Sequence, residues 1–468
     1  MQTYLFYDLE TTGLNKSFDQ ALHFAAIRTD LQFNEINRYE LKIKLNPDVI
    51  PSPYAMLTHH MRLSDIANGI SEYEAAKQIH QWVNEPGTIS LGYNTLSFDD
   101  EFLRFTFYRN LLPPYTHQFA NRCSRMDIYP MTLLYYLFKN NALKWPVKEG
   151  KISLKLEELN NINQFVTGRA HHAMVDVEAT LALAKVFAED REMWNYICGY
   201  FNKKTDQERL QKLGDDTALM VYGKLGYDRQ YQSIVLSLGN HYHYNNQLLW
   251  LRLDDKDFSL EPKESVVQNS FVLQKKLGEP GFILPLRERY LQQVKPEVLN
   301  LAEKNKQWLS DNTDIFKLIR EHYRSFQYPQ VADIDIDAGL YVNGFWSPQE
   351  EFFCKKFSHA KPEEKSKLID KITNPRLYAL ALRILGRNYP GVLTDQQTEE
   401  FESYLQSTKD ASKNICDFKG EKRLNAQTAV SQIKELREIH SHDAEKMELL
   451  AELECELIKF LENGKIIA

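Results

Sequence analysis

The hydrophobic pattern of this chain changes its period along the sequence, and this change restricts the folds that the chain can adopt. From Tyr4 to about Asp190, short apolar runs alternate with segments of helical periodicity, which is typical of an α/β layer. After a polar stretch at 202–215, three short β-type runs lie between Gly, Asn and Asp turns. From about Ser347 the sequence is helical. We therefore expect three regions of different architecture.

The length of the chain agrees with this division. At 468 residues the chain is longer than the roughly 250 to 300 residues at which a single core stops growing. We expect an α/β domain over residues 1–200, a small β-rich, barrel-like domain over 201–347 and a helical domain over 348–468.

Composition narrows the class of protein further. Hydrophobic residues make up 43% of the chain and charged residues 26%, as in ordinary globular domains. No run of about 18 apolar residues occurs, and the first residues lack the pattern of a signal peptide. The five cysteines are scattered and form no C-x-x-C pair, which argues against a disulfide framework and a zinc ribbon. We expect a cytoplasmic protein that does not enter the membrane.

The net charge of −7 does not by itself suggest a nucleic-acid-binding protein, because contacts to phosphate need Lys and Arg. The average hides local differences, however. Lys144, Lys148 and Lys151 are opposed only by Glu149, whereas the acidic excess gathers towards the C-terminal end. A local groove can be positive on an acidic protein. These three lysines are therefore candidates for a phosphate-binding surface, and a solvated loop is the alternative.

The first candidate for chemistry is a pair of acids in the run YLFYDLE. Asp8 and Glu10 lie two residues apart in an expected strand, so both carboxylates leave the same face of the sheet. The alternate residues of this strand are apolar, and the strand ends in a Thr-Thr-Gly turn, where backbone can approach a phosphate closely. Taken alone, the pair also fits an edge strand with its polar face in water.

Two further acids lie at the starts of expected helices. In LGYNTLSFDDE a strand ends at Asn94 and a helix begins near Asp99. We assign Asp99 to the site, and Asp100 to the helix cap or to solvent. In HHAMVDVEAT, Asp176 lies in the first turns of a helix and His171 lies five residues earlier, on the entering loop. Each histidine of this motif, taken alone, also fits an ordinary core or surface position.

Four carboxylates and one imidazole are suited to the hydrolysis of a phosphodiester. Magnesium prefers carboxylate and water ligands to His or Cys, and two ions about 3.5 to 4 Å apart can stabilise both the attacking and the leaving oxygen. An imidazole outside the metal ligands can take the proton from the attacking water. The sequence therefore predicts a nuclease that uses two Mg²⁺ ions, with Mn²⁺ as a possible substitute.

The three motifs, taken in order, resemble the DEDDh (DnaQ-like) exonuclease superfamily: D-x-E from Asp8, N-x-x-x-F-D ending at Asp99, and H-x-x-x-x-D ending at Asp176. Within this superfamily, their surroundings resemble bacterial exonuclease I. The similar segments are HFAAIRTD, LGYNTLSFDDE, SRMDIYPM and AHHAMVDVEATLALAK, and later YVNGFWS and GRNYPGVL. The resemblance therefore covers most of the chain.

This resemblance implies an α/β fold, with a ribonuclease-H-like exonuclease domain on a mixed sheet, a small β-barrel-like domain and a C-terminal helical domain. It implies a monomeric, single-stranded-DNA-specific 3′→5′ exodeoxyribonuclease that releases 5′-mononucleotides in DNA repair and recombination, with single-strand-binding protein as a partner. Carried over position by position, the metal ligands are Asp8, Glu10, Asp99 and Asp176, and the general base is His171. The candidate substrate-binding residues are Thr11, Thr12, Asn94, Lys144, Lys148 and Lys151.

Two residues depart from the family pattern. Thr12 stands where relatives of exonuclease I have an aromatic residue, and His59 stands where a glycine is expected after Thr58. Both departures affect the expected shape of the pocket for the 3′ end. In the central region, Tyr242 and Tyr244 could stack on bases or could be packed inside the β-rich domain.

Two other functions stay open at this point. The chain could be a DEDDh nuclease that acts on RNA or serves a polymerase as a proofreading nuclease. It could also be a catalytically inactive scaffold that binds single strands. All five catalytic residues of the motifs are retained, which favours an active nuclease over the scaffold.

Overall fold

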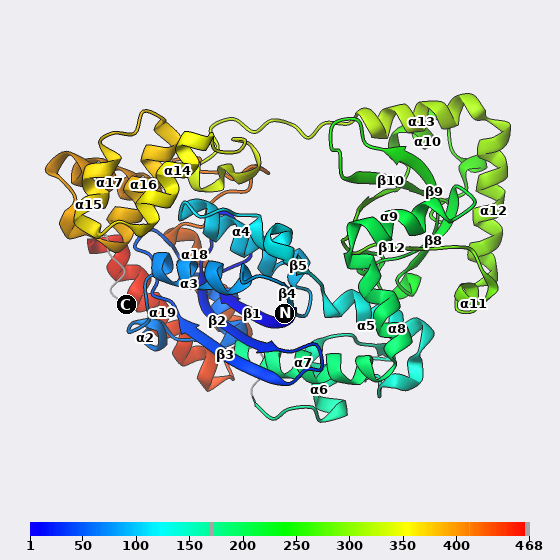
Figure 1. Ribbon diagram of the computed structural model, residues 1–468, viewed down its shortest axis with the longest axis horizontal. Helices are drawn as coiled ribbons and strands as arrows, with labels where there is room; N and C mark the ends of the chain where they lie inside the picture. Colours follow the sequence, from blue (N-terminus) through cyan, green and yellow to red (C-terminus); the bar gives the residue numbers. More distant parts are fainter. Residues whose placement is uncertain (169–171, 411, 464–468) are drawn as a thin grey trace. The chain divides into compact units, whose positions relative to one another are not determined.

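The structure, a computed structural model, describes residues 1–168, 172–410 and 412–463 (Figure 1). The chain divides into two compact units. The first unit comprises Met1–Arg125, Thr167–Glu178 and Gln330–Ala468, and the second comprises Met126–Val166 and Ala179–Pro329. The division into domains at 1–200, 201–347 and 348–468 stays a prediction.

The first unit is built around a mixed five-stranded sheet with the order β3-β2-β1-β4-β5. Strands β1, β2 and β3 pair antiparallel, whereas β4 and β5 run parallel to β1. The mixed sheet expected from the family resemblance is therefore confirmed. The strands are β1 (Thr3–Thr11), β2 (Ala21–Thr29), β3 (Glu35–Lys42), β4 (Thr88–Leu91) and β5 (Ser124–Arg125).

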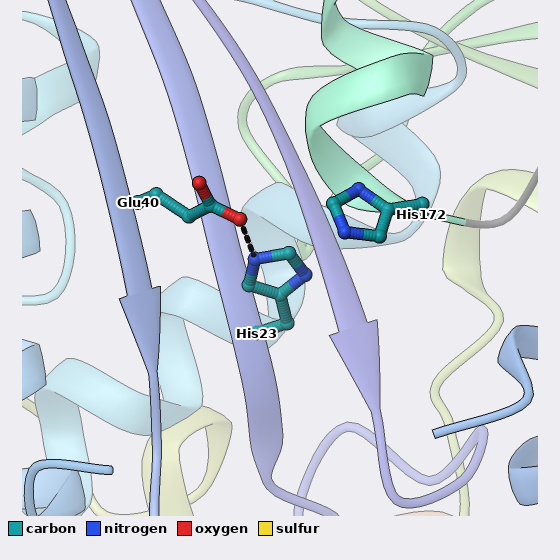
Figure 2. A group of neighbouring side chains, drawn as sticks. All are labelled: His23, Glu40 and His172. Atoms are coloured by element: carbon teal, nitrogen blue, oxygen red, sulfur yellow. Dashed lines mark hydrogen bonds and ion pairs between the residues drawn. The ribbon is translucent and has the colours of Figure 1, made fainter. Parts of the chain in front are cut away.

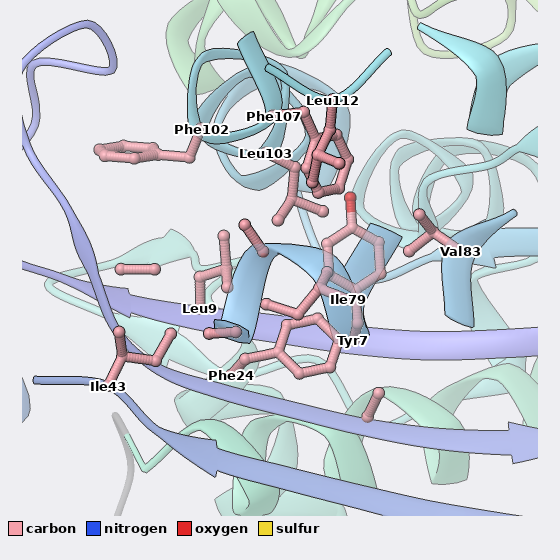
Figure 3. Close-up of a cluster of buried hydrophobic side chains, with 14 of the residues drawn as sticks. Tyr7, Leu9, Phe24, Ile43, Ile79, Val83, Phe102, Leu103, Phe107 and Leu112 are labelled. Atoms are coloured by element: carbon pink, nitrogen blue, oxygen red, sulfur yellow. The ribbon is translucent and has the colours of Figure 1, made fainter. Parts of the chain in front are cut away.

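The central strand β1 shows the alternation expected from its sequence. Tyr7 and Leu9 pack with Phe24 of β2 against α3 and α4 (Figure 3). Because side chains alternate along a strand, Asp8 and Glu10 leave the opposite face of the sheet. The helices of this part of the unit are α1 (Pro53–His59), α2 (Leu63–Ile66), α3 (Glu72–Val83), α4 (Asp99–Arg109) and α7 (Ala173–Glu189), which continues into the second unit.

The C-terminal region of the first unit is helical, as expected. Its helices are α14 (Pro348–His359), α15 (Pro362–Ile369), α16 (Pro375–Asn388), α17 (Asp395–Lys409), α18 (Ala426–Ile439) and α19 (Ala444–Asn463). Helix α14 begins with a capping box, in which Ser347 and Glu350 bond to each other's backbone N–H groups. Part of this region shares an apolar core with α1 and α2, which contribute Leu57 and Ile66, while α18 and α19 contribute Ile433 and Leu450.

The GRNYPGVL segment joins the C-terminal helices to the α/β part through buried charges. Arg387 donates hydrogen bonds to both carboxylate oxygens of Asp48 at 3.0 and 2.7 Å, and Arg423 donates to the same carboxylate at 2.9 Å. Gly386 leaves room for the ring of Phe401, because a Cβ atom at this position would lie 2.4 Å from that ring. Packing thus accounts for Gly386, and ion pairing accounts for Arg387, in this segment.

The second unit contains a five-stranded antiparallel sheet with the order β11-β10-β9-β8-β12. Its strands are β8 (Thr217–Val221), β9 (Gln232–Asn240), β10 (Gln247–Arg252), β11 (Val272–Lys276) and β12 (Phe282–Leu284). The three β-type runs expected from the sequence form β8, β9 and β10. A two-stranded hairpin pairs β6 (Val147–Lys148) with β7 (Lys151–Ile152).

The polar stretch at 202–215 is mostly helical. Helix α9 begins after Asn202, whose side chain accepts a hydrogen bond from the backbone N–H of Thr205. Asp206 and Lys275 form a fully buried ion pair at 2.7 Å, which attaches this helix to β11. The other helices of the unit are α5 (Ile128–Phe138), α6 (Leu156–Asn163), α8 (Arg191–Cys198), α9 (Lys203–Gln211), α10 (Lys263–Asn269), α11 (Glu288–Leu291), α12 (Pro296–Asp311) and α13 (Thr313–Ser325).

Among the residues that the structure describes, no helix combines the length and the apolar character needed to cross a membrane.

Candidate active site

Three acids from two elements converge on one face of the first sheet. Asp8 and Glu10 lie near the carboxyl end of β1, and Asp176 lies in the first turn of α7. One carboxylate oxygen from each lies within 4.8 Å of the others. Residues that are about 170 positions apart in the sequence are therefore brought together as the motifs predicted.

The fourth acid, Asp99, lines the same cavity, which has a volume of about 230 Å³. Asp99 is the first residue of α4 and is 4% exposed. Its Oδ1 accepts a hydrogen bond from the backbone N–H of Leu9 at 3.0 Å, which fixes the start of α4 against β1. The chain that leads from β4 towards α4 also passes close to β1 at Gly92. A Cβ atom at this position would lie 2.4 Å from the carbonyl oxygen of Tyr7.

The pKa values of Asp8 and Glu10 are raised because their carboxyl groups are buried and lie close to the other acids of the cluster. Burial, followed by repulsion from Asp99, Glu10 and Asp176, raises the pKa of Asp8 well above its usual range. Burial and repulsion from Asp176 and Asp99 raise the pKa of Glu10 to about 9. Negative charge at this position therefore needs a cation. Because all the clustered donors are carboxylate oxygens, the residues fit hard divalent ions such as Mg²⁺ or Mn²⁺.

The expected general base, His171, lies outside the described residues, so its assignment stays a prediction. The structure does describe its neighbour His172, which is exposed and precedes α7. The backbone carbonyl of His172 accepts hydrogen bonds from the N–H groups of Val175 and Asp176, and this contact starts the helix. His172 is not among the residues that line the cavity.

The expectation that Asp100 caps the helix or faces solvent is wrong. Asp100 is fully buried, and the residue at the N-cap of α4 is Phe98. The carboxylate of Asp100 accepts hydrogen bonds from Arg104 at 2.6 Å, from Arg125 at 2.5 Å and from the ring of His117 at 2.9 Å. Burial alone would raise the pKa of Asp100, but Arg125 and Arg104 outweigh it and hold this pKa well below its usual range.

We expect Asp100→Ala to destabilise the protein by about 3 to 5 kcal/mol, because Arg104 and Arg125 would be left without their buried partner. Urea unfolding of the variant and the parent measures this difference. The matched control is Asp65→Asn, which alters an exposed carboxylate on α2. If Asp100→Ala unfolds at the same urea concentration as the parent, the ion-pair network does not contribute as argued.

Thr11, Thr12 and Asn94 have different surroundings. Thr11 and Asn94 line the cavity, and Asn94 is exposed in a left-handed backbone conformation with φ of 65°. Thr12 is fully buried, and its hydroxyl donates to Asp19 at 2.8 Å and accepts from the N–H of Gln20 at 3.0 Å. The side chain of Thr12 therefore stabilises the turn after β1 and is not presented to a substrate.

The departure expected at His59 stays a prediction, and the left-handed backbone conformation after Thr58 belongs to the next residue, His60. His60, at the C-terminal end of α1, has the left-handed conformation that favours glycine, with φ of 58° and ψ of 18°. His59 is helical and buried, and it lines the cavity. Its Nδ1 accepts a hydrogen bond from the N–H of Met61 at 3.1 Å, so in the neutral ring Nε2 donates to the carbonyl of Thr11 at 3.2 Å.

The three candidate lysines belong to the second unit, whereas the acids belong to the first. Lys148 and Lys151 lie on the hairpin of β6 and β7 and form ion pairs with Glu158 at 3.3 Å and Asp228 at 2.8 Å. Lys144 is exposed just before this hairpin. All three lysines are accessible, and their role in DNA binding stays a prediction.

The structure shows whether Tyr242 and Tyr244 are exposed or packed inside the β-rich region. Tyr242 is 47% exposed, so it is not packed inside the β-rich region. Tyr244 is partly buried, and its ring centroid lies 5.5 Å from that of Tyr328, which is 53% exposed. This surface offers aromatic faces of the kind on which bases stack.

Sequence reasoning did not include Leu14 among the site residues. Leu14 is 77% exposed, although it is large and apolar, and it lines the cavity with the acids. The signal in the sequence was an apolar residue directly after the Thr-Thr-Gly turn, where a polar loop residue would be usual. Gly13 keeps this turn tight, because a Cβ atom there would lie 2.4 Å from the carboxylate of Asp19.

A mixed sheet with four acids around the carboxyl end of its central strand defines the class of ribonuclease-H-like exonucleases. The family model described as "Exonuclease" matches residues 5–184, and the one described as "Exonuclease I C-terminal domain" matches residues 334–455. The two matches together make the chain similar to exonuclease I.

Named relatives of this family match nearly the whole chain. Exodeoxyribonuclease I of Haemophilus influenzae is 27% identical, over 96% of this chain and 97% of that protein. Exodeoxyribonuclease I of Escherichia coli is 29% identical, over 84% of this chain and 86% of that protein.

Solved structures of exonuclease I have the same fold. Exonuclease I from Methylocaldum szegediense aligns with a TM-score of 0.83 and 26% identity, over 98% of this chain and all of that one. The E. coli enzyme in complex with a dA16 oligonucleotide gives a TM-score of 0.84 at 24% identity, over 99% and 100% of the two chains. An SSB/exonuclease I structure with the inhibitor CFAM gives 0.84 at 23% identity, over 98% and 99%.

Proposed function

We propose that this protein is a 3′→5′ exodeoxyribonuclease that hydrolyses single-stranded DNA to 5′-mononucleotides. The observation that carries the proposal is the convergence of Asp8, Glu10, Asp99 and Asp176 on one cavity. The exodeoxyribonuclease I relatives and the E. coli complex with dA16 support DNA as the substrate. We further propose that the protein acts in DNA repair and recombination in the cytoplasm, as a monomer.

The residues of the site have separate roles in the proposed reaction. Two Mg²⁺ ions, or Mn²⁺, would lower the pKa of the attacking water and neutralise charge on the attacking and leaving oxygens. Asp8, Glu10, Asp99 and Asp176 would hold these ions. His171 would accept the proton that the attacking water loses as its oxygen bonds to phosphorus. The bond from phosphorus to the 3′ oxygen breaks, and this releases a 5′-mononucleotide and a new 3′ hydroxyl end.

The exposed side chain of Leu14 would contact the terminal base, because it is the large apolar group that projects from the turn after β1. A second cavity of about 550 Å³ shares Leu14, Ala55 and Thr58 with the site. This cavity is also lined by Lys16, Lys419, Lys422, Phe418 and Tyr54. Cations and aromatic rings together are what binding of a single strand requires, so we propose that this cavity contributes to the DNA path.

We expect the affinity for a single-stranded oligonucleotide to fall steeply with salt, despite the net charge of −7. Each phosphate neutralised contributes roughly −0.7 to the slope of log K against log salt. Fluorescence anisotropy measures this slope for the parent and for two triple Ala variants. One variant alters Lys16, Lys419 and Lys422, and the other alters Lys144, Lys148 and Lys151. A set that contacts DNA should make the slope shallower by about 2. A slope near zero in the parent would contradict both proposals.

Single-strand-binding protein is the partner that we propose. The SSB/exonuclease I structure supports this proposal, because it shows a protein of the same fold together with that partner. Pull-down of the purified chain with SSB, compared with bovine albumin as a control, tests the interaction directly.

One substrate panel separates the proposed function from its alternatives. The panel compares 5′-labelled single-stranded DNA, duplex DNA and RNA, with Mg²⁺ or with a chelator. We expect shortening of the single-stranded DNA from its 3′ end, with Mg²⁺ only. Faster degradation of RNA would favour an RNA nuclease. Rapid removal of a mismatched 3′ end from a duplex would favour proofreading, and binding without cleavage would favour an inactive scaffold.

A further inference from the structure

A second cluster of potential metal ligands lies outside the cavity of the acids. It consists of His23 on β2, Glu40 on β3 and His172 directly before α7 (Figure 2). The Nε2 atom of His23 lies 2.9 Å from Oε1 of Glu40. The ring centroid of His172 lies 5.2 Å from that of His23, with the two planes nearly perpendicular. One donor atom from each residue lies within 4.8 Å of the others.

Strand register places this cluster beside the catalytic carboxylates. His23 is the direct antiparallel partner of Glu10, and directly paired residues project from the same face of a sheet. On β3, Glu40 lies two residues before Lys42, which is the direct partner of His23. Residues two apart on a strand share a face, so Glu40 is a diagonal neighbour of His23. His172 directly precedes α7 and lies four residues before Asp176 in the sequence.

The two groups of ligands differ in chemistry. The four acids offer carboxylate oxygens, which suit Mg²⁺, whereas two imidazoles and one carboxylate suit Zn²⁺. We propose that His23, Glu40 and His172 form a zinc site that is separate from the carboxylate cluster. Three protein ligands leave the fourth position of a tetrahedral site open.

The cluster needs only a small adjustment to bind the ion. With bonds of about 2.0 to 2.2 Å, tetrahedral N and O ligands lie about 3.4 Å apart. The donor atoms of His23 and Glu40, now 2.9 Å apart, would separate slightly, and the donor atom of His172, which lies within 4.8 Å of the other two, would move closer. His23 is buried and fixed in position, while Glu40 and His172 are exposed and can rotate towards it. The ion would then replace the direct contact between His23 and Glu40.

The competing explanation is a simple hydrogen bond between His23 and Glu40, with His172 packed against the ring. That explanation accounts for the contacts but predicts no affinity for zinc. The two explanations therefore differ in a quantity that does not depend on nuclease activity.

Titration of the full-length protein with Co²⁺, which takes the place of Zn²⁺, tests the proposal. The protein is first stripped with a chelator and then held in excess Mg²⁺, which occupies the carboxylate cluster. We expect one Co²⁺ per chain with the strong visible absorption of a tetrahedral site, and displacement by Zn²⁺. His23→Gln and Glu40→Gln should each abolish this absorption. His359→Gln, which alters an exposed histidine on α14, should leave it unchanged.

Two outcomes would overturn the proposal: the parent shows no tetrahedral Co²⁺ absorption, or Glu40→Gln keeps the absorption of the parent. Glu40 is exposed, so its replacement is not expected to unfold the protein, and thermal melting checks this. Hydrolysis of single-stranded DNA in zinc-free Mg²⁺ should be similar for Glu40→Gln and the parent. A failed zinc titration with normal hydrolysis would therefore reject the zinc site and leave the proposed nuclease function intact.

Discussion

Replacing any one carboxylate of the cluster with its amide should reduce the rate of hydrolysis of single-stranded DNA by about 10³-fold or more. A metal ion supplies several kcal/mol of transition-state stabilisation, and each 1.36 kcal/mol corresponds to a factor of about 10 in rate. Single-turnover degradation of a 5′-labelled oligonucleotide at saturating Mg²⁺ measures this effect. The substitutions are Asp8→Asn, Glu10→Gln, Asp99→Asn and Asp176→Asn.

The control for this series should be Glu35→Gln, an exposed carboxylate on β3 of the same sheet. Asp100 is unsuitable as a control, because it is the buried partner of Arg104 and Arg125. Binding of single-stranded DNA should persist in the amide variants, since affinity comes mainly from cationic and stacking contacts. A variant that keeps nearly the parent rate would show that its residue is not a metal ligand.

The raised pKa values of Asp8 and Glu10 also predict a change in stability. A carboxyl whose pKa is higher in the folded than in the unfolded state makes the folded state bind more protons, so stability is lost as pH rises through the folded pKa. In a chelator at pH 8, Asp8→Asn should therefore melt at a higher temperature than the parent. Mg²⁺ should raise the melting temperature of the parent more than that of the variant. Equal stabilisation of both would argue against a metal site at Asp8.

His171→Ala should lower the catalytic rate by about 10² to 10⁴-fold, which is the usual contribution of a general base. Its neighbour His172 is not among the residues that line the cavity, so His172→Ala should stay within a few fold of the parent. Both variants are assayed side by side in zinc-free Mg²⁺, so that metal binding at His172 does not contribute. Mg²⁺ affinity should be nearly unchanged in His171→Ala, because the imidazole is not a ligand.

The pH profile gives an independent check on this base. A neutral imidazole accepts a proton, so the rate of the parent should fall on acidification as the base becomes protonated. His171→Ala should lose this part of the profile. If His172→Ala is the impaired variant, or if both variants are fully active, the general base has been assigned to the wrong residue.

Local patterns in the sequence were sufficient to select four acids that the structure brings together at one cavity. The alternation in YLFYDLE predicted that Asp8 and Glu10 share a face, and β1 has this arrangement. The helix start expected near Asp99 and the helix expected to begin shortly before Asp176 match α4 and α7, because cap and periodicity signals lie within a few residues of each other. The order of the three motifs indicated the exonuclease I family, which the family models and named relatives support.

The sequence assigned Asp99 to the site, but only the tertiary structure showed where Asp100 lies. The two are adjacent in sequence and about 100° apart around a helix, given 3.6 residues per turn. Asp99 lines the cavity, while Asp100 is held by His117 and Arg125 from later segments. No local pattern specifies these partners. For the same reason, the sequence of the Thr-Thr-Gly turn did not indicate that Thr12 is buried and forms hydrogen bonds with Asp19 and Gln20.

The sequence by itself determined which residue types and which local elements carry the chemistry. The tertiary structure decided that Asp99 lines the cavity while Asp100 is held in a buried ion-pair network, and it decided which residues from distant segments meet. The His23, Glu40 and His172 cluster shows the difference clearly, because its members come from β2, β3 and the residue before α7 and share no sequence motif. Strand period and helix caps are short-range properties, whereas burial and ion pairing depend on contacts that only the folded chain creates.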